Sequence, residues 1–124
     1  MIVEDLMKKP IAIEKDVMLV DAAKLMTKHK INSLIFLVND KIAGIITHED
    51  LVAHFGEQKK VSEIMTRQVL MVKKNDKIQK AMDLIREKNI SIVPVVDNKG
   101  DLVGVVHAKD ILNQACASDD FLMD

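Results

Sequence analysis

Apolar residues recur along this chain in two patterns, one typical of helices and one typical of strands. The helical pattern occurs twice, with apolar residues at positions i, i+3, i+4 and i+7 counted from Leu19 and again from Ile78. Each helical segment is followed by two apolar runs that flank a short polar turn, a pattern typical of a β-hairpin. The hairpin strands are expected at 34–38 and 42–47, and at 93–96 and 102–106. Both halves of the chain therefore predict a helix followed by a hairpin.

The same order of elements repeats at a period of about 60 residues. Each half opens with a short helical turn, continues with a short extended piece and closes with a helix. The turns are expected at 3–7 and 61–65, the extended pieces at 11–13 and 69–72, and the closing helices at 48–55 and 108–116. Two copies are too few to stack as an open solenoid, so a pseudo-twofold arrangement is expected.

The predicted fold class is α+β (α/β), with two pseudo-twofold-related β-α-β-β-α units packed sheet to sheet. Each sheet is expected to have one face covered by the two helices of its own copy. The expected boundaries are residues 1–58 and 59–118, followed by a frayed acidic tail at 119–124. Residues 56–60 are expected to form a hinge between the copies, because they are too few for a flexible linker.

The clearest repeated motif is the seven-residue segment at 44–50 and 104–110. Its glycine and two β-branched apolar residues predict a buried strand, and the polar residues that follow predict a helix start. Thr47 is a favourable helix N-cap, and Asp50 stands where a carboxylate meets the positive end of the helix dipole. The backbone N–H groups of a helix start suit an anionic or polyhydroxyl ligand. The same residues also fit a capping box without any ligand. The second copy favours a ligand, because Asp110 is kept where His107 has replaced the capping hydroxyl.

Composition limits the classes of protein to which the chain can belong. Apolar residues make up 48% of the chain, which predicts a folded core rather than disorder. The formal net charge is −1 and three Phe are the only aromatic residues, which argues against nucleic-acid binding. No apolar run approaches the length of a membrane span, and no secretory signal is expected. The single cysteine, Cys116, excludes an internal disulfide and fits a cytoplasmic location.

Neither a metal site nor a catalytic site is expected. His48 and His54 are six positions apart and do not share a helical face, whereas paired ligands on a helix stand three or four apart. Glu49 and Asp50 point about 100° apart on a helix. No nucleophile or glycine-rich phosphate loop accompanies them, so the chain is not expected to be an enzyme.

Three features resemble the CBS domain pair, or Bateman module. They are Met65-Thr66 at the opening of the second copy, the run from Ile92 to Gly104, and the two closing segments. The resemblance covers essentially the whole chain. It implies a regulatory ligand sensor with two pseudo-equivalent clefts between the copies and no required cofactor. Such clefts bind AMP, ADP or ATP, and in some members S-adenosylmethionine or NAD; some pairs bind Mg²⁺.

The resemblance also implies roles for individual residues. Asp50 and Asp110 would each accept hydrogen bonds from both ribose hydroxyls, because an ionised carboxylate is a strong acceptor. Thr47 would donate to a phosphate or to the 5′ oxygen. The opening strand of the opposite copy would hold the adenine, so residues 69–72 would serve the first carboxylate and residues 11–13 the second. The expected ligand-binding residues are Ile11, Ala12, Ile13, Asn32, Thr47, Asp50, Val69, Leu70, Met71, Ser91, His107 and Asp110.

The chain departs from the family pattern at the position that reaches toward phosphate. Asn32 and Ser91 stand where Arg or His is frequent, so charge compensation would fall on Lys109, Lys41 or a second chain. His107 would either bind a phosphate or fill its cleft. We therefore expect the cleft with Thr47 to be the better nucleotide site.

The resemblance further implies a homodimer formed through the closing helices, and an effector protein that receives the signal. The interface residues would be Leu51, Val52, Phe55, Ile111 and Leu112, which also fit an intramolecular core. Two other functions remain open: a structural dimerisation module with vestigial clefts, and a sensor of S-adenosylmethionine, NAD or Mg²⁺.

Overall fold

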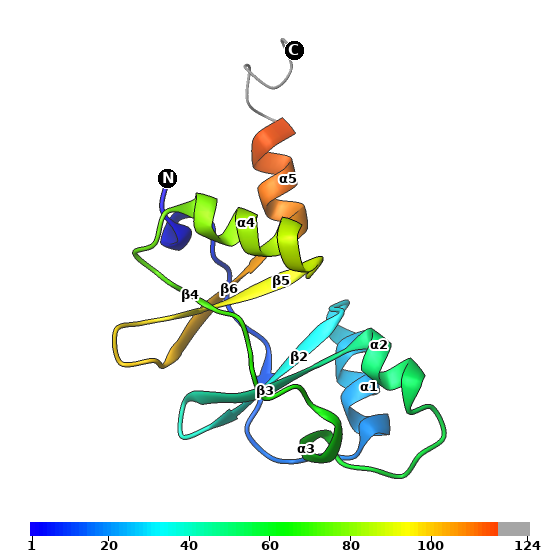
Figure 1. Cartoon of the computed structure of the whole chain (residues 1–124). Helices are drawn as coiled ribbons and strands as arrows, with labels where there is room; N and C mark the ends of the chain where they lie inside the picture. The colour runs from blue at the N-terminus through cyan, green and yellow to red at the C-terminus, as the bar shows by residue number, and fades with distance from the viewer. Residues whose placement is uncertain (117–124) are drawn as a thin grey trace. The chain divides into compact units, whose positions relative to one another are not determined.

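The computed structural model describes residues 1–116, and the chain divides into two compact units (Figure 1). One unit is the uninterrupted segment Ile11–Val69, called here the continuous unit. The other combines Met1–Pro10 with the chain from Leu70 onward and is called the split unit. No helix among the described residues is both long enough and apolar enough to cross a membrane.

The continuous unit contains a three-stranded sheet of order β1-β2-β3. Strand β1 is parallel to β2, whereas β2 and β3 form an antiparallel hairpin. Its turn residues Asn39 and Asp40 have φ of 52° and 66°, as a two-residue hairpin turn of the primed kind requires. The elements in chain order are β1 (Ala12–Ile13), α1 (Leu19–His29), β2 (Ser33–Val38), β3 (Lys41–Thr47), α2 (His48–Ala53) and α3 (Val61–Ile64).

The split unit repeats this plan with a sheet of order β4-β5-β6, in which β4 is parallel to β5 and β5 antiparallel to β6. Its elements are a 3-10 turn η1 (Val3–Asp5), β4 (Val72–Lys73), α4 (Ile78–Lys88), β5 (Ile92–Val96), β6 (Leu102–His107) and α5 (Ala108–Cys116). Helices α1 and α4 both end at a left-handed residue, Lys30 and Asn89, which is a common way to terminate a helix. The predicted α+β class and element order are confirmed, although α2 ends at Ala53 rather than at residue 55.

The opening turn of each repeat packs into the core of the other repeat. Val61 and Met65, which open the second repeat, belong to the core of the continuous unit. Val3, which opens the first repeat, is fully buried in the core of the split unit, with Leu6 and Met7 packed against it. Each sheet is therefore covered by the two helices of its own repeat and by a turn exchanged from the other, which the sequence did not predict.

Two glycines of the repeated motif make room for the exchanged turns. A Cβ added at Gly44 would lie 2.7 Å from Cγ of Met65 and 3.0 Å from the carbonyl oxygen of Thr66. A Cβ at Gly104 would lie 2.7 Å from Sδ of Met7. These glycines are therefore needed for close approach.

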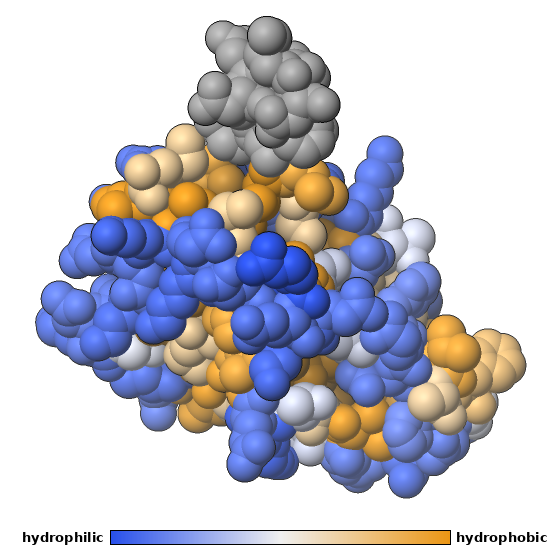
Figure 2. Space-filling model, turned by 45° about the horizontal axis from the view of Figure 1, so that its top comes forward, coloured by the Kyte–Doolittle hydropathy of each residue, from blue (hydrophilic) through white to orange (hydrophobic). Residues whose placement is uncertain are grey.

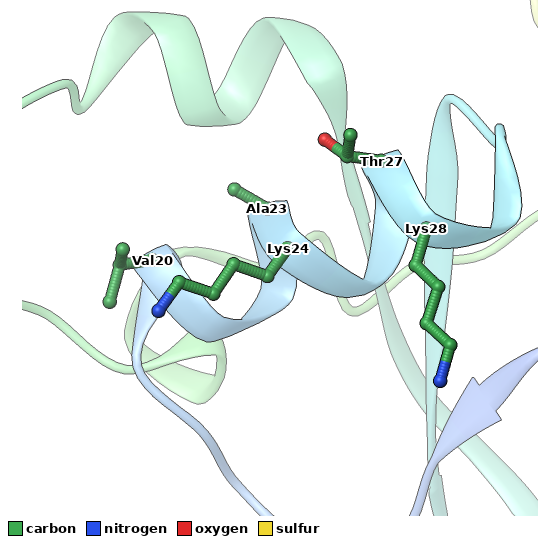
Figure 3. Close-up of a pocket in the computed structure, with 5 residues that line it drawn as sticks. All are labelled: Val20, Ala23, Lys24, Thr27 and Lys28. Carbon is green, nitrogen blue, oxygen red and sulfur yellow. The ribbon is translucent and has the colours of Figure 1, made fainter.

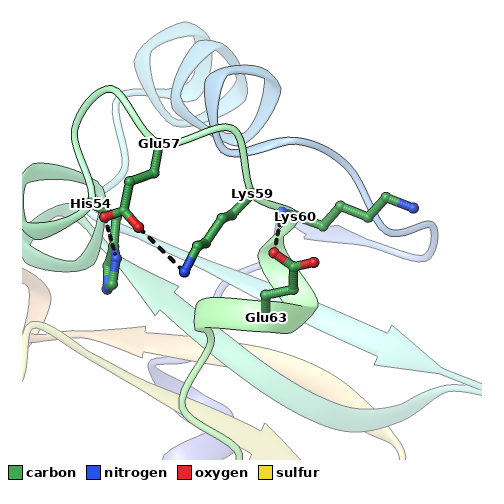
Figure 4. A network of polar contacts seen from close by, with 5 residues as sticks. All are labelled: His54, Glu57, Lys59, Lys60 and Glu63. Carbon is green, nitrogen blue, oxygen red and sulfur yellow. Dashed lines mark hydrogen bonds and ion pairs between the residues drawn. The ribbon is translucent and has the colours of Figure 1, made fainter.

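The expected hinge at residues 56–60 is wrong, because this segment lies inside the continuous unit. The carbonyl of Lys59 accepts a hydrogen bond from the N–H of Leu19 at 2.9 Å. Glu57 contacts Nδ1 of His54 at 2.8 Å and Nζ of Lys59 at 3.3 Å (Figure 4). The chain instead passes between the units at residues 10–11 and 69–70. The predicted acidic tail at 119–124 lies outside the described residues.

Candidate functional site

The predicted ligand-binding residues divide between the two units. The continuous unit contains Ile11, Ala12, Ile13, Asn32, Thr47, Asp50 and Val69, and the split unit contains Leu70, Met71, Ser91, His107 and Asp110. The predicted assignment of residues 69–72 to Asp50 and of residues 11–13 to Asp110 mostly joins residues of different units, and it stays a prediction. Within each unit, the structure brings the helix start together with the residue predicted to reach toward phosphate.

In the continuous unit, the junction of β3 and α2 forms a complete capping box. The carboxylate oxygen Oδ2 of Asp50 accepts from the backbone N–H of Thr47 at 2.8 Å and from its hydroxyl at 3.0 Å. The hydroxyl Oγ1 of Thr47 in turn accepts from the backbone N–H of Asp50 at 3.3 Å. The carbonyl of Asn32 accepts from the N–H of His48 at 2.9 Å, which places Asn32 beside this helix start. The capping alternative is thus present, and it uses Oδ2 of the carboxylate.

In the split unit, the junction of β6 and α5 is built differently. Ser91 lies beside the helix start, because its carbonyl accepts from the N–H of Ala108 at 2.8 Å. Position 107 has no hydroxyl, and Oδ1 of Asp110 instead accepts from Nζ of Lys8 at 3.1 Å. Oδ2 of Asp110 is buried and accepts no hydrogen bond from the described residues. Leaving a buried carboxylate oxygen without a donor is unfavourable, so this atom marks a position where a donor would be stabilising.

The ring of His107 is half-buried beside this carboxylate. Burial lowers the pKa of His107 below its ordinary value, because a desolvated ring disfavours the charged form. The Asp110 carboxylate opposes this shift, whereas Lys109 and Lys8 add to it. His107 therefore favours its neutral form more than an exposed histidine does, and the cationic side chains that act on it are Lys8 and Lys109.

The predicted adenine-contacting residues differ in exposure. Leu70 and Met71, which directly precede β4, are 42% and 37% exposed and offer apolar surface. The side chain of Ile13 is buried in the core of the continuous unit, so only its backbone is available to a ligand. Lys41 begins β3, at the opposite end of that strand from Thr47.

Sequence reasoning missed Lys8. Its backbone pairs with Val105 through two hydrogen bonds of 2.8 and 2.9 Å. In the continuous unit, Thr66 pairs with Ile45 through two hydrogen bonds of 2.9 Å. Lys8 and Thr66 thus hold equivalent positions, and the signal in the sequence was that each follows the methionine that ends an opening turn.

A hollow of about 410 Å³ lies elsewhere, on the outer face of α1 (Figure 3). Val20, Ala23, Lys24, Thr27 and Lys28 line it, and none of the predicted ligand-binding residues does. Among the residues that the structure describes, no three His, Cys, Asp or Glu side chains gather as a metal site.

The predicted interface residues separate into core and surface. Ile111 is buried in the core of the split unit, and Leu51 packs against the core of the continuous unit. Val52, Phe55 and Leu112 are 70%, 89% and 63% exposed. Figure 2 shows apolar surface at the right-hand edge of the molecule, on the side where α2 lies in Figure 1.

The CBS domain model matches the chain twice, at residues 3–57 and 61–115. The chain is 36% identical to an L-aspartate semialdehyde sulfurtransferase of Methanocaldococcus jannaschii, over 89% of the chain and 22% of that enzyme. It is 31% identical to an inosine-5′-monophosphate dehydrogenase of the same organism, over 90% of the chain and 23% of that enzyme. The chain thus spans less than a quarter of the length of these two relatives.

The structure is similar to the CBS domain pair of protein MJ0100, solved in complex with 5′-methylthioadenosine and S-adenosyl-L-methionine. The TM-score is 0.83 and the identity 34%, over 92% of this chain and 94% of that one. Two matched domains, a three-stranded sheet in each unit and similarity to a CBS domain pair over most of both chains agree with one another, and this chain belongs to the CBS domain family as a tandem pair.

Proposed function

We propose that this CBS domain pair binds an adenosine nucleotide of the AMP, ADP or ATP class and relays its occupancy to a partner. CBS domain pairs are ligand-binding regulatory modules. The observation that carries the proposal is the carboxylate of Asp110, which stands at a helix start with Oδ2 buried and without a donor among the described residues.

A ribose fits the chemical requirement of this carboxylate. Its two neighbouring hydroxyls are donors, and hydrogen bonds to an ionised acceptor are the stronger kind. The backbone N–H groups at the start of α5 and the ammonium of Lys8 favour an anion such as a phosphate nearby.

The MJ0100 domain pair supports an adenosyl ligand, because both of its ligands carry a 5′-deoxyadenosyl group, although neither bears a phosphate. We propose Asp110 as the stronger site and Asp50 as a weaker second site. This order reverses the expectation from sequence, because Oδ2 of Asp50 already accepts two hydrogen bonds from Thr47. A ligand at Asp50 therefore competes with the helix cap.

No resident cofactor is needed for this role, and the chain acts as a regulatory module rather than as a catalyst. The partner is a separate protein or another part of a larger one. A ligand shifts a conformational equilibrium only by its differential affinity for the two arrangements, so the relay requires that the ligand bind one arrangement more tightly.

The second candidate is a structural dimerisation module with vestigial ligand sites. The complete capping box at Thr47 favours it, since that carboxylate has a structural role without a ligand. The exposed side chains of Val20, Val52 and Phe55 on and beside the α1–α2 pair supply apolar surface for a homodimer.

Thermal unfolding in the presence of AMP, ADP, ATP, S-adenosylmethionine, NAD and MgCl₂ tests the two candidates. A ligand at a hundredfold excess over its dissociation constant adds about 2.7 kcal/mol to the stability, which raises Tm by several degrees. We expect an adenosine nucleotide to give the largest rise and Asp110→Asn to abolish most of it. The control Asp83→Asn alters an exposed ion pair with Arg86 on α4 and should leave the rise intact. If no adenosine compound raises Tm, the sensor proposal is wrong.

A further inference from the structure

We infer that Lys8 sets the ligand specificity of the Asp110 site, as an internal cation that a ligand must displace and that then binds the ligand's phosphate. This inference rests on the proposed function and deepens it. The ligand class that it selects is a phosphate-bearing adenosine compound, in preference to the neutral nucleoside.

The geometry allows Lys8 to release the carboxylate without unfolding. Its backbone is fixed by the two hydrogen bonds with Val105, so only the side chain needs to move. That side chain is 59% exposed, whereas the side chain of Asp110 is 13% exposed. An ion pair with one partner so exposed is weak, and the ammonium is rehydrated readily when it leaves. Lys8 is therefore a displaceable partner for a carboxylate that is otherwise covered.

Charge balance determines which ligand gains from this displacement. A neutral nucleoside that binds the carboxylate separates Lys8 from its counter-ion and offers the ammonium no new charged acceptor. A phosphate provides that ammonium with a new charged acceptor, and such hydrogen bonds are the stronger kind. Lys109 stands on the same helix turn, and both Lys8 and Lys109 lie close enough to His107 to lower its pKa, so two ammonium groups lie near this junction. The local excess of positive charge favours an anionic ligand.

The continuous unit provides a natural contrast. Thr66 occupies the position equivalent to Lys8, with the same backbone pairing to its strand. In the repeat, Glu49 stands at the position of Lys109. The Asp50 site therefore lacks both lysines and has an acidic residue instead, so its ligand need not bear a phosphate. We therefore expect a preference for phosphate at the Asp110 site and none at the Asp50 site.

The test uses the full 124-residue chain, with adenosine and AMP as the two probes. Amide chemical shifts resolve the sites, because Val105 and Val106 report on the split unit and Ile45 and Ile46 on the continuous unit. For the wild type, we expect AMP to bind the split unit about tenfold more tightly than adenosine, with the preference falling as salt is added.

Four substitutions test the role of Lys8. Lys8→Met keeps the aliphatic stem and should remove the AMP preference, with adenosine binding strengthened. Lys8→Arg keeps the charge and should retain the preference. Thr66→Lys is the matched change in the other unit and should create a preference for AMP there. The backbone pairing of each position is untouched, and Lys8→Gln provides a second neutral variant in case the methionine variant does not fold.

The outcomes separate the two proposals. If AMP and adenosine bind the split unit and Asp110→Asn prevents it, but both neutral variants leave their affinity ratio unchanged, the role of Lys8 is refuted and the proposed function stands. If neither probe shifts any amide of the split unit or of the continuous unit in the wild type, both proposals are wrong.

Discussion

Replacing Gly44 with alanine should destabilise the protein by about 1–3 kcal/mol, the usual cost of overpacking a core. The added methyl would lie 2.7 Å from Cγ of Met65 and 3.0 Å from the carbonyl oxygen of Thr66, so the exchanged turn must shift. The backbone at Gly44 is not in the left-handed region, so alanine brings no conformational strain there. Without these contacts, the substitution would stabilise by about 0.4–1 kcal/mol through the unfolded chain.

The partner substitution Met65→Ala should cost about 2–5 kcal/mol, because Met65 is only 9% exposed and its removal leaves a cavity. In the double variant, the alanine methyl at position 44 enters space that the methionine has left. The two costs should therefore sum to more than the measured loss, with a coupling of about 0.5–3 kcal/mol. The rescue is partial, because the carbonyl of Thr66 stays in place.

Urea denaturation of the wild type, both single variants and the double variant measures the coupling, and unchanged m-values would show that the unfolded state is not altered. Gly56→Ala is the control: its φ is +86° and no atom lies within 4 Å, so strain alone destabilises it and no coupling to Met65 is expected. The same cycle with Gly104 and Met7 repeats the test in the split unit. Additivity of Gly44→Ala and Met65→Ala within about 0.5 kcal/mol would refute the packing argument.

Three further predictions concern the cap, the histidine and the exposed apolar surface. Thr47→Ala should destabilise by about 1 kcal/mol in urea, through loss of the helix cap, and Thr47→Ser should retain most of the stability. Because the pKa of His107 is lowered on folding, its stabilising contribution should be complete above pH 6.5, its ordinary pKa, and lost progressively at lower pH. Denaturation between about pH 5 and pH 8 should show this dependence weakened in His107→Gln, and an identical profile for both proteins would contradict it. Phe55→Ser should weaken self-association in sedimentation experiments with little change in Tm, since its side chain is 89% exposed; an unchanged sedimentation profile of a dimer would place the interface elsewhere.

The elements of the fold were predictable because their sequence signals are local. The apolar stripes that begin at Leu19 and Ile78 correspond to helices that begin at those residues. The exchange of opening turns was not predictable in this way. Val3 and Val61 are apolar residues in similar short turns, and no neighbouring residue indicates which sheet each one covers. Periodicity identifies a buried face, but the other surface that it contacts is set by long-range packing.

The residues of the candidate site also differ in whether a local sequence signal could predict their contacts. The cap at Thr47 and Asp50 was predictable, because its partners are three residues apart. Lys8 and Asp110 are 102 residues apart, so no local pattern links them. The one signal in the sequence that pointed to Lys8 was the alignment of the two repeats, in which Lys8 follows Met7 as Thr66 follows Met65.

The two segments of the split unit precede and follow the continuous unit in the chain, and this order has a consequence for biosynthesis. All of Ile11–Val69 is synthesised before any strand of the later sheet. The continuous unit can fold at once, whereas Val3 can pack into its core only after the strands of the split unit have been translated. The first ten residues are thus the last to pack into a core. A gene divided between residues 58 and 59 would encode two fragments that need each other to fold.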